Sequence, residues 1–180
     1  MPIEPLSGAN TIPSSTGAAL TGTAEVLLFP PLQIAIPTAD VRPGRVWKLT
    51  AGGIYTTNTT GTLTIKPYWG QSGTIGTNIT MGTGLAQTVP VYSVTAGAWY
   101  MEFCALCMST SWQTGAHASV IGSGYFKGQG NAAIAASANN LVFGGTAATV
   151  DPTNSGISIT WTLSVAGSIS PQWQILQSLN

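Results

Sequence analysis

The sequence predicts an all-β fold, a jelly-roll-like antiparallel β-sandwich with an extended N-terminal arm. Apolar residues alternate with Thr and Ser over several short stretches, and no window of about 12 residues carries apolar residues at helical spacing. Gly, Asn and Pro recur between these stretches at intervals of roughly 8–15 residues, as in sandwiches and barrels. Long connections and a strand at the C-terminus favour a jelly roll over a simple meander. The 180 residues suffice for one domain.

Residues 1–22 are expected to form the arm, and residues 23–180 the sandwich domain. Three prolines in the arm, Pro2, Pro5 and Pro13, exclude regular structure there. The apolar side chains that such an arm could place on a neighbouring subunit are Ile3, Leu6, Ile12 and Leu20. An unstructured terminus is the alternative that the sequence leaves open.

The first half of the domain is expected to consist of short strands separated by turns. Thr62–Trp69 alternates cleanly, with every second residue apolar, which is typical of a strand with one buried face. Arg45–Thr57 is also expected to be a strand, and Gly52 and Gly53 predict a β-bulge in its middle. Shorter extended pieces are expected at Ala24–Phe29, Leu32–Ile36, Thr77–Gly84 and Thr88–Val94.

Ala98–Met108 is the densest apolar run of the chain, and it is expected to be the central strand. Both of its faces are apolar, and Glu102 interrupts one of them. An ordinary sandwich strand buries a single face, so the second face should be covered by another subunit or by a second layer of this one. The residues of that face that are expected to contact a partner are Tyr100, Glu102, Leu106 and Met108.

The second half of the domain continues the pattern. Ile157–Val165 alternates apolar residues with Ser and Thr over its whole length, which predicts a strand. Gly128–Asn140 is rich in Ala, Asn and Ser and is expected to be a loop. Other strands are expected at Ala116–Phe126, Leu141–Phe143, Thr146–Val150 and Ile169–Leu179.

Charge is scarce in this chain. The composition is 44% hydrophobic and 6% charged, with a formal net charge of zero, so the sequence predicts no net electrostatic attraction to nucleic acid or to anionic lipid. The longest apolar run is too short to span a bilayer, which takes about 20 residues. The N-terminus lacks the basic and apolar regions of a signal peptide, so folding inside a cell is expected. A weakly charged surface suits a permanent assembly.

The sequence predicts no catalytic, metal or cofactor site. Cys104 and Cys107 have C-x-x-C spacing, but in a strand they would point to opposite faces, which excludes a shared metal. His117 is the single histidine, and no nucleophile elbow accompanies it. The carboxylates show no pairing typical of glycoside hydrolysis. Glu102 is expected to form an ion pair with one of four cations, namely Arg42, Arg45, Lys48 or Lys66.

Tryptophan suggests one possible ligand site. Four of the six tryptophans lie in dense apolar stretches and are expected to be buried: Trp47, Trp99, Trp161 and Trp173. Trp69 and Trp112 adjoin loops, so they are the candidates for exposed rings that contact a glycan.

The Arg45–Trp69 block, RVWKLTAGGIYTTNTTGTLTIKPYW, resembles a segment that recurs in structural proteins of tailed bacteriophages. In those proteins a strand with spaced tryptophan, leucine and glycine is followed by a Thr-rich turn and a G-T-L-T-I strand. The W-x-x-E stretch at Trp99–Ala105 and the alternating strand Ile157–Val165 are similar as well. The resemblance covers about residues 23–180 and implies a jelly-roll or similar sandwich, often trimeric. It implies no active-site residue.

Composition and resemblance together lead to one functional hypothesis. The chain is expected to be a virion structural protein, made in the host cytoplasm, that decorates and stabilises the capsid exterior as a homotrimer bound to the major capsid protein or other virion proteins. No enzymatic activity is expected, and the arm residues expected to contact the capsid are Ile3, Leu6 and Ile12. The alternative is a tail or fibre-tip protein that recognises host surface glycans through loops.

Overall fold

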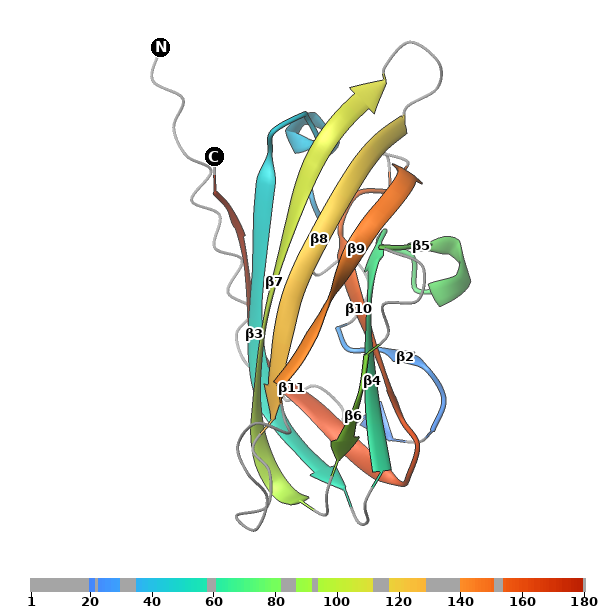
Figure 1. The fold of residues 1–180 in the computed structure, drawn as a ribbon, viewed down its shortest axis with the longest axis vertical. Coiled ribbons are helices and arrows are strands. Elements are labelled where there is room, and N and C mark those ends of the chain that lie inside the picture. The colour runs from blue at the N-terminus through green and yellow to red at the C-terminus, as the bar shows by residue number, and fades with distance from the viewer. Residues whose placement is uncertain are drawn as a thin grey trace.

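The structure, a computed structural model, describes residues 20–21, 23–29, 35–57, 61–81, 87–91, 94–111, 117–128, 140–150 and 154–179. These residues form two antiparallel β-sheets that pack face to face, which confirms the all-β sandwich (Figure 1). Ile3, Leu6, Ile12, Trp112 and most of the loop predicted at Gly128–Asn140 lie outside the described residues. The strands are β1 (Leu20–Thr21), β2 (Val26–Leu27), β3 (Val46–Thr57), β4 (Gly61–Trp69), β5 (Ile79–Thr80), β6 (Gln87–Val91), β7 (Val94–Ser111), β8 (His117–Gly128), β9 (Asn140–Val150), β10 (Ile157–Leu163) and β11 (Gly167–Ser178).

The larger sheet has six strands in the order β1-β11-β3-β7-β8-β9. The smaller sheet has the order β2-β10-β4-β5, and β6 pairs with β4. The consecutive strands β3 and β4 lie in different sheets, where they pair with β11 and β10 respectively. Two distant parts of the chain are thus wrapped against each other, as in a jelly roll, whereas β7, β8 and β9 form a meander.

The two lateral openings between the sheets are flanked by different segments, and contacts between the sheets narrow one of them. On one side, β9 at the edge of the large sheet contacts β4 and β6 of the small sheet. On the other side, β1 pairs with β11 in the large sheet and β2 pairs with β10 in the small sheet. Residues Leu20 and Thr21, which the sequence assigned to the arm, therefore belong to the sheet.

The core lies between the sheets and is built by the strict alternation of the inner strands. Trp47 of β3 packs on Trp69 of β4 with ring centroids 5.4 Å apart, so these two indoles join the two sheets. Trp99 stacks on Phe126 at 5.6 Å within the large sheet. Burying such rings contributes the largest apolar areas that single side chains can supply.

The bulge predicted at Gly52 and Gly53 is wrong in its position. β3 runs through both glycines without interruption, and the register shift lies opposite them in β11, between Pro171 and Trp173. An extra residue in one strand reverses the side to which the following side chains point. Ile169, before the shift, is buried in the core, whereas Trp173, after it, is 39% exposed. The expectation that Trp173 is buried is therefore also wrong.

Helical structure is confined to two three-residue 3-10 turns in the described part of the chain, Thr38–Asp40 and Ile75–Thr77. Neither has the length or the apolar character needed to cross a membrane.

Candidate functional site

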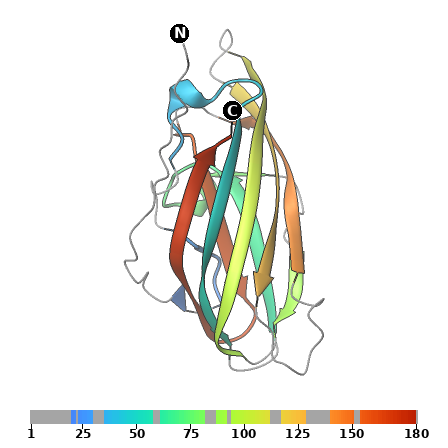
Figure 2. The ribbon, with the colours of Figure 1, turned by 90° about the vertical axis from the view of Figure 1, so that its left-hand side faces the viewer.

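The outer face of the large sheet, which points away from the small sheet, carries the second face of the central strand β7. Figure 2 looks onto this sheet, with β11, β3, β7, β8 and β9 side by side and no described element in front of them. Along β7, Tyr100, Glu102 and Leu106 are half-buried and Met108 is exposed. Within the described residues, this chain therefore supplies no second layer for the face.

Three rings lie next to one another across this face, and we call them the aromatic row: Trp173 on β11, Tyr100 on β7 and Tyr125 on β8. The ring centroids of Trp173 and Tyr100 are 6.0 Å apart, and those of Tyr100 and Tyr125 are also 6.0 Å apart. Lys127 places its ammonium group 5.2 Å from the centroid of the Tyr125 ring. The interplanar angles of 44° and 41° give a stepped surface.

Gly52 makes this arrangement possible. β3 lies between β11 and β7, and Gly52 is the residue opposite both Trp173 and Tyr100. A Cβ atom at Gly52 would lie 2.7 Å from the Trp173 indole, so a larger residue would displace the ring. The bulge in β11 turns Trp173 outward, and the missing side chain at Gly52 lets it cross the neighbouring strand to Tyr100.

Glu102 sits beside the row in a network of hydrogen bonds. Its Oε2 atom accepts a bond from Lys48 Nζ at 2.9 Å and from the Tyr100 hydroxyl at 3.1 Å. The bond from Lys48 holds the pKa of Glu102 below its ordinary value, with a further contribution from Tyr100. Burial and the bond to Glu102 raise the pKa of Tyr100 to about 12, so its hydroxyl stays protonated and donates. Lys48 is thus the partner of Glu102 among the four candidate cations.

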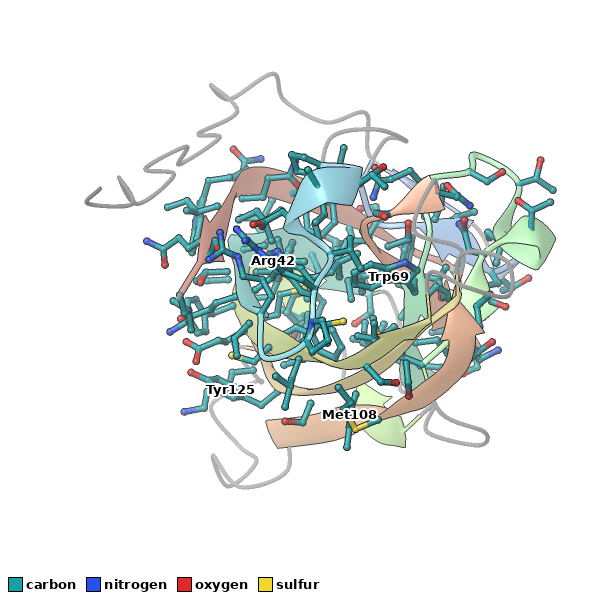
Figure 3. The ribbon with its side chains drawn as sticks, turned by 90° about the horizontal axis from the view of Figure 1, so that it is seen from above. Arg42, Trp69, Met108 and Tyr125 are labelled. Atoms are coloured by element: carbon teal, nitrogen blue, oxygen red, sulfur yellow. The ribbon has the colours of Figure 1, made fainter. Side chains whose placement is uncertain are left out.

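The other end of the outer face is apolar and uncharged, and we call Leu106, Met108 and Ile121 the apolar end. Leu106 lies directly opposite Ile121 in the β7–β8 register. Met108 is 43% exposed and Ile121 is 38% exposed. Figure 3 shows Met108 and Tyr125 at the periphery of the sandwich, in contrast to Trp69 in its middle. Along β7, Tyr100 and Leu106 are six positions apart, or about 20 Å at 3.3 Å per residue.

The described carboxylates do not form a catalytic pair. Glu25 lies on the outer side of the small sheet, where Thr160, Tyr68 and Lys66 donate to it at 2.7, 2.8 and 3.2 Å. Glu102 lies on the outer side of the large sheet, with the core between the two. Retaining and inverting glycosidases both need two carboxyl groups within roughly 10 Å across one cleft. Asp151 and Glu4 lie outside the described residues.

The third described carboxylate, Asp40, is structural. It is buried at one end of the sandwich, where Arg45 Nε and Nη2 approach its Oδ1 at 2.6 and 2.5 Å. Trp47 Nε1 donates to Oδ2 at 2.8 Å. These bonds occupy both oxygens and tie the 3-10 turn to the first core tryptophan.

The cysteines point to opposite sides of β7, as strand geometry predicts. Cys107 is fully buried, and Cys104 is half-buried on the outer face opposite Lys48. Burial raises the pKa of both thiols. In the described part of the chain, no three His, Cys, Asp or Glu side chains gather where they could bind a metal ion.

The structure changes the choice of exposed aromatics. Trp69 is 1% exposed, and its ring is enclosed between the sheets, so it cannot contact a glycan at the surface. Trp69 is the last residue of the alternating strand β4, and this alternation predicted its burial better than its closeness to a loop predicted its exposure. Trp173 was missed because the sequence does not reveal the bulge. The one signal available was Pro171, since proline in a strand is confined to edges and bulges.

The sequence matches no protein-family model and no curated protein. Among solved structures, an endo-1,3-beta-glucanase from Streptomyces sioyaensis aligns with 78% of this chain and 67% of its own, at 11% identity and a TM-score of 0.27. Such a low TM-score does not indicate a common fold, so this likeness assigns neither a family nor an activity.

Proposed function

We propose that this protein is an architectural protein that assembles with copies of itself through the outer face of its large sheet. The sequence resemblance supports a role on the virion of a tailed bacteriophage, where the protein would decorate and stabilise the capsid exterior as a homotrimer. No catalytic role is part of the proposal.

The apolar end carries the proposal. Leu106, Met108 and Ile121 form an uncharged cluster on an otherwise regular sheet face, and two of them are large apolar side chains with more than a third of their surface exposed. Exposed apolar clusters of this kind mark interaction sites. A second copy is the best-suited partner, because a chain with zero net charge has no overall repulsion from itself. Closed homo-oligomers are also the commonest way to cover such a face.

Tyr100 and Glu102, which the sequence grouped with Leu106 and Met108, belong to the opposite end of the face. They are held in the network with Lys48 and the aromatic row. The proposed contact between copies is therefore narrower than the sequence indicated, and it gains Ile121 from β8.

The mass of the protein in solution tests this proposal. Light scattering on the purified chain should give a small multiple of 18.4 kDa. The double variant Met108→Glu/Ile121→Glu should give the mass of one chain, because it places like charges against each other across the contact.

The matched control is Ile54→Glu. Ile54 is 43% exposed on the same sheet but lies beyond the aromatic row, away from the apolar end. This variant should keep the oligomeric mass and the circular dichroism of the wild type. A wild type that stays monomeric at high concentration, or a double variant that keeps the wild-type mass, would contradict the proposal.

A further inference from the structure

We propose that the aromatic row is a binding site for a neutral oligosaccharide, with sugar rings stacking on Trp173, Tyr100 and Tyr125. This site is separate from the loops considered in the sequence, and it does not depend on the proposed assembly.

Stability of the fold does not explain why Trp173 is turned outward or why Gly52 lies beneath its ring. Glycine within a strand weakens the strand, and an indole that is 39% exposed contributes less to the core than a buried one. Yet β11 carries a bulge that turns Trp173 outward, and β3 carries Gly52 at the position where any Cβ would meet that ring. Bulges that re-aim a side chain are frequent next to functional sites.

The chemistry around the rings fits a sugar. A pyranose ring presents flat C–H faces, which pack on aromatic rings, and a rim of hydroxyl groups that both donate and accept hydrogen bonds. Lys48 and Lys127 offer N–H donors at the edges of the row. Glu102 uses Oε2 for both of its bonds, and within the described residues Oε1 remains as an acceptor.

The same chemistry disfavours an apolar protein surface as the occupant. Covering the row with apolar side chains would remove Lys48, Glu102 and Lys127 from water without new hydrogen bonds, which is costly. Because charges of both signs are interspersed, an ionic ligand gains no uniform attraction, so the ligand is expected to be neutral. The stepped rings, tilted by 41° and 44°, fit a single twisting chain better than the flat surface of a crystalline polysaccharide.

The row can be occupied while copies associate through the apolar end. The nearest members of the two groups, Tyr125 and Ile121, are four positions apart on β8, or about 13 Å at 3.3 Å per residue. A sugar ring that stacks on Tyr125 therefore leaves Ile121 uncovered.

The test is an array of neutral oligosaccharides of four to six hexose units, probed with the full-length protein and followed by calorimetric titration of the best ligand. We expect binding that falls at least tenfold in Trp173→Ala and in Tyr125→Ala. Gly52→Val keeps all three rings but displaces one, so it should also weaken binding. Leu179→Ala is the matched control, because Leu179, directly after β11, is an apolar residue that is 53% exposed and lies outside the row; it should bind like the wild type.

Several results would overturn the proposal. These are the absence of binding to any oligosaccharide of the array, binding only to insoluble crystalline polysaccharide, and binding that Trp173→Ala and Tyr125→Ala leave unchanged. Light scattering on the same variants separates this proposal from the assembly. A change of oligomeric mass in Trp173→Ala would make the row a contact between copies and overturn the saccharide site. A monomeric wild type that binds the sugar would contradict the assembly and leave the site intact.

Discussion

Replacing Asp40 with alanine should destabilise the sandwich by about 3–4 kcal/mol, because it leaves the Arg45 guanidinium partly buried without its counter-ion. Asp40 has a side chain that is 7% exposed, and that of Arg45 is 13% exposed. Two N–H groups of Arg45 and the indole N–H of Trp47 all end on this carboxylate.

The magnitude follows from these contacts. Removing one partner of a buried ion pair costs about 3–5 kcal/mol, and the lower part of the range applies because Arg45 keeps some contact with water. Proteins of this size are stable by about 5–15 kcal/mol, so the variant should still fold in dilute buffer. In the double variant Asp40→Ala/Arg45→Met the loss should be smaller than in Asp40→Ala, since no unpaired charge remains.

Urea unfolding followed by tryptophan fluorescence measures these differences as shifts of the midpoint at constant slope. Arg42→Ala is the control, because Arg42 is an exposed cation of the same loop. It should change stability by less than about 0.5 kcal/mol, as surface substitutions do. A loss below about 1 kcal/mol in Asp40→Ala, or a double variant less stable than the single one, would refute this assignment of the Asp40 contacts.

Two further predictions concern titratable groups. Burial raises the pKa of Glu25, but the bonds from Thr160, Tyr68 and Lys66 outweigh it and hold the pKa below its ordinary value of 4.5. Such a carboxylate stabilises the fold above its unfolded-state pKa and loses that effect as the pH falls through its folded-state pKa. The difference in unfolding free energy between the wild type and Glu25→Gln should therefore shrink as the pH falls from about pH 5 to pH 3. A difference that stays constant over this range would be inconsistent with the bonds to Glu25. Cys104 is half-buried and Cys107 is fully buried, so Cys104 should react slowly with iodoacetamide in the native protein, and Cys107 should react only after unfolding. Equal reaction rates of the two thiols in the native protein would contradict this difference in burial.

Alternation predicted the sandwich because side-chain period is a local property. β3, β4, β7, β10 and β11 all begin and end within four residues of the positions expected from the sequence, since each carries a continuous run with a buried face. The order of the strands in the sheets could not be predicted from the sequence, for a physical reason. The pairing of β3 with β11 joins residues more than a hundred positions apart, and the local pattern of a single sequence does not indicate which strands pair with each other.

The candidate site was predicted in part. The second face of Ala98–Met108 was recognised because its apolar residues recur at every second position, and the structure places it on the outer side of the large sheet. The division of that face into the aromatic row and the apolar end was not foreseen. It depends on the bulge before Trp173, which reverses the orientation of the rest of β11, and on Gly52 in another strand.

The most direct measurement of the proposed architectural role is an electron-microscopy map of purified virions that carry this protein. The proposal predicts copies on the outer capsid shell, grouped around a symmetry axis with Leu106, Met108 and Ile121 of each copy against a neighbour. Copies at the tail tip, or copies on the capsid whose apolar ends face solvent, would contradict it.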